Sequence, residues 1–274
     1  MEQIRKPFQG VLNILSFNRH FYVIGLGVLA LIITSHLLIG WSNLLFWLIV
    51  AAFLYGLIMP LLVSAYVYDF SGYYNFHWLK NYAVADSSTN HILNINAGFD
   101  ETSFIIKNYF PQSDLKGYDF YNAKHHTEPA IIRARKVSLA YPNTEQIKSN
   151  LIPEKDNSVD IIFLLSAAHE IRSNDEKVQF LKECHRICKP NGKVIMVEHL
   201  RDFPNFLAFS IGFTHFFSRS AWKNAFEQAG FVTFQETKCV NPIEKAKKLG
   251  KSLKCSTIIT FPFGLQIRWH SFKN

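Results

Sequence analysis

Two histidine–carboxylate pairs carry the clearest chemistry in this sequence. His169 precedes Glu170, His199 follows Glu198, and each pair comes after an apolar run. Histidine has an ordinary pKa near neutral pH, so it is suited to take a proton from a phenol or an enol. A neighbouring carboxylate can orient the ring or shift its pKa. His169, Glu170 and His199 are therefore the candidate catalytic residues. The alternatives are strand capping for the histidines and a solvent-facing side chain for Glu170.

A second group of polar residues suggests a ligand-binding turn. Residues 94–100 read NINAGFD, and residues 115–120, which end in Asp119 and Phe120, read as a strand. A turn of small residues lets backbone N–H groups approach a ligand, and a helix N-terminus behind it adds a positive dipole. A carboxylate at the end of the next strand can hold ribose hydroxyls. The candidate cofactor ligands are Asn94, Asn96, Gly98, Asp100 and Asp119.

Alternating patterns from His91 onward predict the elements that position these residues. Strands are expected at 91–96, 115–120, 145–149, 159–166, 193–198, 231–238 and 256–261, and helices at 101–109, 128–140, 175–188 and 220–229. Alternating strands and helices predict an α/β fold with a doubly wound, mostly parallel sheet of seven strands. No helical pattern separates the last two strands, so we expect them to be antiparallel. Ligands bind such sheets beyond the carboxyl ends of the strands, where all the candidate residues fall.

Two segments resemble class I S-adenosylmethionine-dependent methyltransferases of the small-molecule and quinone type. Residues 153–160 (PEKDNSVD) lead into the fourth strand, and 180–193 (FLKECHRICKPNGK) resemble that family's helix, Lys-Pro-Gly-Gly-type turn and fifth strand. The resemblance covers about residues 85–262 and implies a Rossmann-like domain that binds S-adenosylmethionine. By this resemblance, residues 94–100 bind the methionine part and Asp119 the ribose hydroxyls. The fourth strand then ends beside the transferred methyl, which makes His169 the first choice as base.

The cofactor loop departs from the family pattern of one acid and three alternate glycines. Asn94, Asn96 and Asp100 stand there with a single glycine, Gly98. Asn94, as a neutral acceptor, should hold an ammonium more weakly than a carboxylate would, whereas Asp100 could cap the next helix or replace the missing charge. The acid that contacts adenine in the family is also not evident near residues 148–150. Two alternatives stay open: an inactive cofactor-binding membrane scaffold, or a relative that transfers a group other than methyl to a quinone.

The N-terminal quarter of the chain predicts a membrane anchor. Residues 20–68 contain no Asp, Glu, Lys or Arg, and the apolar runs 21–39 and 44–67 are each about as long as a membrane-spanning helix. We expect a leader at 1–19, either an interfacial helix or disordered. Two transmembrane helices at 20–67, a connector at 68–88 and a methyltransferase-like domain at 89–274 should follow. Basic residues in the leader favour a multi-pass protein of the cytoplasmic membrane with its domain in the cytoplasm.

Charge and composition indicate the partners. The chain has 29 basic and 21 acidic residues, net charge +8, and no nucleic-acid-binding motif. Such charge suits anionic lipids, and a lysine run at 245–254 is expected to face them. The expected substrate is a lipophilic, membrane-resident small molecule such as a quinone, a phenolic pigment or a lipid.

No metal site is expected, since Cys184 and Cys188 read as core residues and His125-His126 as solvated. His215 is expected in a lid or substrate wall. An interfacial collar, with a substrate portal as the alternative, is expected from Tyr68, Tyr73, Tyr74 and Trp78.

Overall fold

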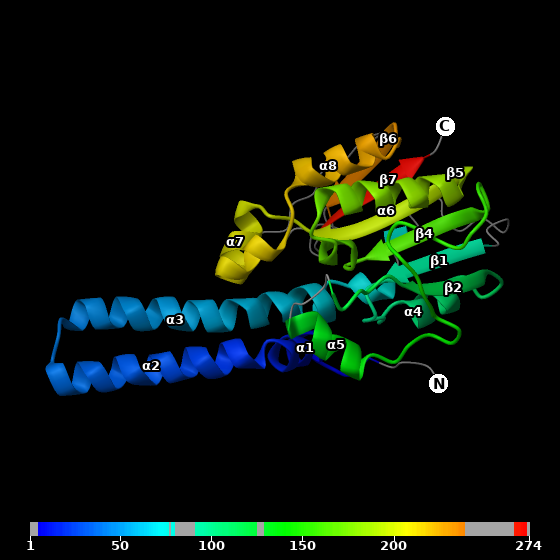
Figure 1. Ribbon diagram of the computed structural model, residues 1–274. Coiled ribbons are helices and arrows are strands. Elements are labelled where there is room, and N and C mark those ends of the chain that lie inside the picture. The colour runs from blue at the N-terminus through cyan, green and yellow to red at the C-terminus, as the bar shows by residue number, and fades with distance from the viewer. Residues whose placement is uncertain (1–4, 77, 80–90, 125–128, 239–265, 273–274) are drawn as a thin grey trace, which may run out of the picture.

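The computed structural model describes residues 5–76, 78–79, 91–124, 129–238 and 266–272, which form a helical arm and an α/β domain (Figure 1). The arm contains α1 (Gln9–Phe17), α2 (Arg19–Ile39) and α3 (Asn43–Ser64). Gly40 ends α2 with a φ of 69°, a left-handed conformation that glycine adopts without strain. The chain therefore reverses, and α2 and α3 run side by side away from the domain (Figure 1).

Two helical stretches are long and apolar enough to cross a membrane. They are Arg19–Ile39 and Asn43–Asn75, where α3 continues through the π-helix Ala65–Phe70 and the 3-10 helix Tyr73–Asn75. Helix α2 has no buried residue, and α3 contains Pro60 without ending there. These two apolar helices agree with the predicted runs, and their crossing of a bilayer stays a prediction. The leader forms α1, and its interfacial position likewise stays a prediction.

The first five strands of the domain form a parallel sheet. They are β1 (His91–Asn96), β2 (Asp114–Asp119), β3 (Glu145–Gln146), β4 (Val159–Leu165) and β5 (Cys188–His199). The strand order is β3-β2-β1-β4-β5-β7-β6. At the edge, β6 (Thr233–Lys238) and β7 (Gln266–Phe272) pair antiparallel, and β7 is also antiparallel to β5. The parallel strands confirm the predicted α/β class. The strand expected at 256–261 lies outside the described residues, and β7 takes the place beside β5.

Strand β4, at the centre of the sheet, is buried on both faces, as its apolar run predicted. Ile162 and Leu164 pack into one hydrophobic cluster, whereas Ile161, Phe163 and Leu165 pack into another. Alternate residues of a strand point to opposite faces, so one short run supplies two cores.

The helices of the domain are α4 (Ser103–Tyr109), α5 (Pro129–Val137), α6 (Asn174–Ile187), α7 (Phe203–Phe209) and α8 (Arg219–Gln228).

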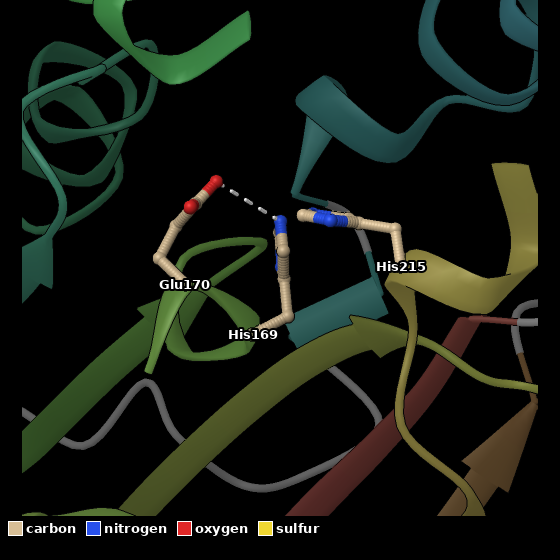
Figure 2. A group of neighbouring side chains, drawn as sticks. All are labelled: His169, Glu170 and His215. Atoms are coloured by element: carbon tan, nitrogen blue, oxygen red, sulfur yellow. Dashed lines mark ion pairs between the residues drawn. The ribbon is translucent and has the colours of Figure 1, made fainter. Parts of the chain in front are cut away.

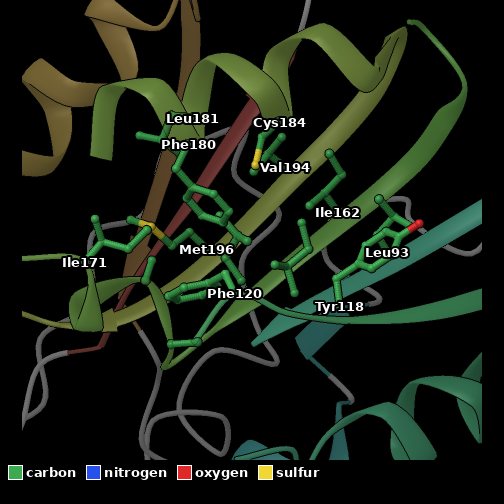
Figure 3. Packing of buried hydrophobic residues seen from close by; sticks show 14 of the residues in the cluster. Leu93, Tyr118, Phe120, Ile162, Ile171, Phe180, Leu181, Cys184, Val194 and Met196 are labelled. Carbon is green, nitrogen blue, oxygen red and sulfur yellow. The ribbon is translucent and has the colours of Figure 1, made fainter. Parts of the chain in front are cut away.

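Helix α6 covers one face of the sheet through an apolar stripe. Phe180, Leu181 and Cys184 of α6 pack over Val194 and Met196 of β5, and each is 0 or 1% exposed (Figure 3). The helix begins after Ser173, whose hydroxyl accepts a hydrogen bond from the Glu176 N–H. Cys188 is also buried in this cluster. The two cysteines are therefore core residues, as predicted.

The arm joins the domain through a close helix contact. A Cβ atom on Gly10 of α1 would lie 2.6 Å from Cβ of Tyr68, so only glycine allows this approach. The Gly10 N–H donates a hydrogen bond to Asp69 Oδ1 at 3.0 Å. On its other side, Phe17 of α1 joins the core cluster of the domain and meets Phe99 edge to face. The first helix thus lies between α3 and the carboxyl end of β1.

Candidate active site

A cavity of about 490 Å³ lies where the arm meets the carboxyl ends of β1, β4 and β5. The domain contributes polar strand ends, including Asn96, Ser166, His169, Glu170 and His199. The arm contributes mostly apolar and aromatic side chains, including Phe17, Phe21, Tyr22, Pro60 and Tyr68. The part of the wall from the domain therefore carries polar and titratable side chains, and the part from the arm suits an apolar ligand.

The turn after β1 has the conformation that a close ligand approach needs. Gly98 has a φ of 81°, and its N–H donates to Asn96 Oδ1 at 2.7 Å. Asn96 Nδ2 and Ser166 Oγ are buried and have no hydrogen-bond partner among the residues that the structure describes. Both residues line the cavity, and Ser166 has a φ of 52°, a strained value that often marks a ligand site. These two polar atoms fit the amino-acid end of S-adenosylmethionine.

Asn94 and Asp100 face the start of α4. The Asn94 amide donates to Thr102 Oγ1 at 3.0 Å and Ser103 Oγ at 2.8 Å, and it lies 3.3 Å from Asp100 Oδ1. The same Asp100 oxygen accepts the N–H groups of Thr102 and Ser103 at 3.0 and 2.9 Å. A carboxylate at position 94 would face Asp100 with like charge, whereas an amide donates. The Asn94 amide nitrogen thus fixes the loop and Asp100 caps the helix, whereas the contact of Asn94 with a cofactor ammonium stays a prediction.

Asp119 is bound by an arginine that the sequence did not single out. Its Oδ2 pairs with Arg135 Nη1 at 2.7 Å, and its Oδ1 accepts the Tyr121 N–H at 2.8 Å. Arg135 also donates to Ala97 O at 2.9 Å and lies 4.0 Å from the Tyr121 ring centroid. A Cβ atom on Gly98 would lie 1.4 Å from Arg135 Nη1. The guanidinium therefore occupies the space between the cofactor turn and the predicted ribose ligand.

His169 is held by a fully buried carboxylate. It lies in the 3-10 turn Ala168–Glu170 after β4, with Nδ1 2.7 Å from Glu198 Oε2 and Nε2 3.5 Å from Glu170 Oε1. Burial disfavours the charged ring, but the charge and hydrogen bond of Glu198, helped by Glu170, outweigh it and raise the pKa of His169 to about 9. At neutral pH His169 therefore carries a proton. In this form the ring is a charged hydrogen-bond donor, whereas the sequence suggested an unprotonated base.

His199 is neutral and tied to the arm. Its Nε2 lies 2.7 Å from the Tyr68 hydroxyl, and its ring stacks on Phe216 with centroids 5.0 Å apart. Burial, followed by the positive charge of His169, lowers the pKa of His199 to about 3. The two predicted histidines thus lie on one wall, with His169 charged and His199 neutral, because Glu198 faces only His169.

His215 brings a third imidazole to this wall. It ends the 3-10 helix Ser210–His215, and its ring meets His169 edge to face at 5.0 Å (Figure 2). Ligand atoms of His169, Glu170 and His215 all lie within 4.8 Å of one another. His215 and Phe216 line the cavity, which agrees with the expected substrate wall. The proximity of His215 to His169 and Glu170 was missed because His215 comes from a separate segment.

Glu101 connects the arm to the cofactor turn. Its carboxylate forms an ion pair with Arg5 Nη1 at 2.8 Å and accepts hydrogen bonds from Asn13 Nδ2 at 3.1 Å and the Tyr74 hydroxyl at 2.5 Å. Glu101 lines the cavity, as do the expected collar residues Tyr68, Tyr73 and Tyr74. These tyrosines are therefore cavity residues in the structure. Trp78, also expected in the collar, packs against the second core cluster.

A second cavity of about 720 Å³ lies at the ends of β2 and β3. Its wall includes Lys148, Ser149 and Asn150, where the resemblance places the adenine. Asp175 and Glu176 at the start of α6 line it as well, and Ser149 Oγ lies 2.6 Å from Glu176 Oε1. Acids from α6 are thus present in this region, although none follows the third strand.

The chain is similar to several known proteins. Residues 114–196 match the family described as a methyltransferase domain. A highly reducing polyketide synthase from Pyrenophora dematioidea is 31% identical over 92 residues, which are 28% of this chain and 4% of the synthase. Solved structures of S-adenosylmethionine-dependent methyltransferases are also similar. One from Aquifex aeolicus is 17% identical with a TM-score of 0.44, covering 78% of this chain and 98% of its own. One from Methanosarcina mazei is 13% identical with a TM-score of 0.46, covering 72% and 97%.

The family match covers the chain from β2 into β5. This segment is similar to a methyltransferase domain and contains parallel strands of the α/β sheet.

Proposed function

We propose that this protein transfers a methyl group from S-adenosylmethionine to a lipophilic, membrane-resident small molecule such as a quinone, a phenolic pigment or a lipid. The observation that carries the proposal is the mixed origin of the cavity wall. Phe21 and Pro60 come from the two apolar helices, whereas Ser166 and His169 follow β4. A molecule that lies among these helices in a bilayer reaches the polar strand ends without crossing water.

The anchor in this proposal is the pair α2 and α3. At their far end, Leu37, Leu38 and Ile39 are 77, 80 and 75% exposed. A continuous apolar surface of this kind is unfavourable in water and is covered by lipid in a membrane. The basic residues Arg5 and Lys6 precede the first span and Arg19 begins it, so the domain lies on the cytoplasmic side.

The chemistry divides between the two ends of the cavity. S-adenosylmethionine, when bound, supplies a methyl group on a positively charged sulfur. Asn96 and Ser166 hold its amino-acid end. The charged ring of His169 stabilises negative charge on an acceptor oxygen and so favours loss of the hydroxyl proton. His199 is a neutral acceptor on the same wall, connected to the cavity through the Tyr68 hydroxyl. Phe209 and Phe216 help to exclude water.

The test uses the full chain in liposomes with methyl-labelled S-adenosylmethionine. A lipid extract and an aqueous metabolite extract serve as separate acceptor pools. Label should enter the lipid pool. Phe21→Ser removes an apolar cavity wall and should raise the KM for that pool by about tenfold, the scale for losing an apolar contact of this size. Val23→Ser, at a position 69% exposed on the same helix, is the matched control.

The outcomes separate the alternatives. Label found only in water-soluble products would refute a lipophilic acceptor. Binding of S-adenosylmethionine in a calorimetric titration, with no labelled product from either pool, would favour the cofactor-binding scaffold. The observation that favours the scaffold is the ion pair between Arg135 and Asp119, because the guanidinium already binds the carboxylate predicted to hold the ribose.

A further inference from the structure

Three side chains of the kinds that bind metals converge on the cavity wall beside β4. His169 and Glu170 belong to the turn after the strand, and His215 comes from the segment that follows α7. One ligand atom from each lies within 4.8 Å of the other two, and all three residues line the cavity (Figure 2). The set therefore faces the space where a substrate would lie.

Glu198 fixes His169 in the orientation that a metal ligand requires. Its Oε2 lies 2.7 Å from Nδ1 of the ring, and its Oε1 accepts the His169 backbone N–H at 3.2 Å. Glu198 is 0% exposed, so it cannot turn to water. Metal-binding histidines usually donate their second ring N–H to such a carboxylate, which sets the tautomer and the ring plane. With Nδ1 held, Nε2 is directed toward Glu170 Oε1 at 3.5 Å.

The charges of the cluster favour a cation. Glu170 and Glu198 bring two carboxylates to the same imidazole, and both are less than 10% exposed. The ion pair between His169 and Glu198 does not by itself explain why Glu170 and His215 also lie next to His169. A dication accounts for the whole group, because two imidazoles and one carboxylate complete half of an octahedral shell or most of a tetrahedral one.

We propose that His169, Glu170 and His215 bind one divalent transition-metal ion, with its remaining coordination positions open to the cavity. Two imidazoles and a carboxylate suit Mn²⁺, Fe²⁺, Co²⁺ or Zn²⁺, whereas Ca²⁺ and Mg²⁺ prefer oxygen ligands alone. Binding of the ion does not depend on methyl transfer. Its role rests on the proposed function: the ion takes the place of the proton on His169, binds the acceptor oxygen as a Lewis acid and favours its anionic form.

The test measures metal binding directly. The full chain is purified in detergent, stripped with EDTA, dialysed, and titrated with Mn²⁺ under electron paramagnetic resonance and with Co²⁺ under visible absorption. One ion per chain should bind. Glu170→Gln and His215→Ala should each bind at least about tenfold more weakly. Glu198→Gln, which loses only the supporting carboxylate, should bind about 10- to 100-fold more weakly. His185→Ala removes a histidine that packs against Phe231, away from the cluster, and should bind as the wild type does.

Circular dichroism checks each variant for folding, and Glu170→Gln decides the matter where His215→Ala fails to fold. Substoichiometric binding by the wild type would overturn the proposal. So would equal affinity in the folded Glu170 and Glu198 variants, because the ion would then lie elsewhere. If the ion binds but no lipophilic acceptor is methylated, the proposed function fails and the metal site stands. If methylation persists in the EDTA-stripped protein, the acceptor role of the ion is refuted.

Discussion

Replacing Arg135 with alanine tests whether its guanidinium and the cofactor compete for Asp119. The pair is joined at 2.7 Å, with side-chain exposures of 27% for Arg135 and 13% for Asp119. Partly exposed ion pairs contribute up to about 1 kcal/mol, and ribose hydroxyls must break this one to reach the carboxylate. Because about 1.4 kcal/mol is a tenfold change in affinity, Arg135→Ala should tighten S-adenosylmethionine binding by about fivefold.

The assay is a calorimetric titration of the detergent-purified full chain with S-adenosylmethionine. Lys136→Ala is the matched control, since it removes the same charge from an exposed position of α5. Gly98→Ala supplies a second perturbation, because its Cβ would lie 1.4 Å from Arg135 Nη1 and 2.9 Å from Asp119 Oδ2. Its loss of affinity should be smaller when Arg135 is also alanine. Weaker binding by Arg135→Ala alone would refute the competition and make Arg135 a cofactor ligand.

Three further predictions concern the arm, the buried ion pair and catalysis. Gly10→Leu should destabilise the fold by about 1–3 kcal/mol because its Cβ would meet Tyr68 Cβ at 2.6 Å, whereas Gly27→Leu, with nothing within 4 Å, should change little. Thermal unfolding followed by fluorescence measures both, and equal losses would contradict the packing argument. In the EDTA-stripped protein the pKa of His169 is raised from 6.5 to about 9, so its pairing stabilises the fold fully below pH 6.5, and this stability is lost as the pH rises through about 9. Urea unfolding across this range should show that decline, and a Glu198→Gln variant with the same slope would rule out the pair as its source. His169→Ala should lower turnover about 10²-fold with cofactor affinity nearly unchanged, and His199→Ala should do less. The labelled-methyl assay ranks them: the reverse order would exchange their roles, and full activity in both would leave alignment alone as the source of catalysis.

The parallel sheet could be predicted because its signals are local. The first strand was predicted at the bounds that the structure gives, His91–Asn96. The fourth has an apolar run because both of its faces are covered, and burial of nearly every residue follows from that. The predicted bounds of β3 (145–149) and β5 (193–198) differ from those in the structure. Short pairing with β2 limits β3 to Glu145–Gln146, and β5 begins early, at Cys188, where it already pairs with Val159.

The contacts inside the site could not be read from the chain. Arg135 lies in the predicted helix 128–140, and only the folded turn brings it to Asp119. Asn94 reads as a weakened cofactor ligand until Asp100, Thr102 and Ser103 are seen around its amide. Likewise, the charge of His169 depends on Glu198 from a neighbouring strand. Such pairings depend on distances between segments, which residue patterns do not encode.

The bonds to Glu101 have a consequence for how the protein is made. Arg5, Asn13 and Tyr74 precede Glu101 in the chain, so a ribosome releases all three partners before the carboxylate that they bind. The order of synthesis therefore makes all three partners available before the turn after β1 is complete. A domain produced without the arm would fold with this acid uncompensated at the cavity wall. Expression trials of the isolated domain would then yield a protein whose cofactor turn is loose, whatever the quality of its sheet.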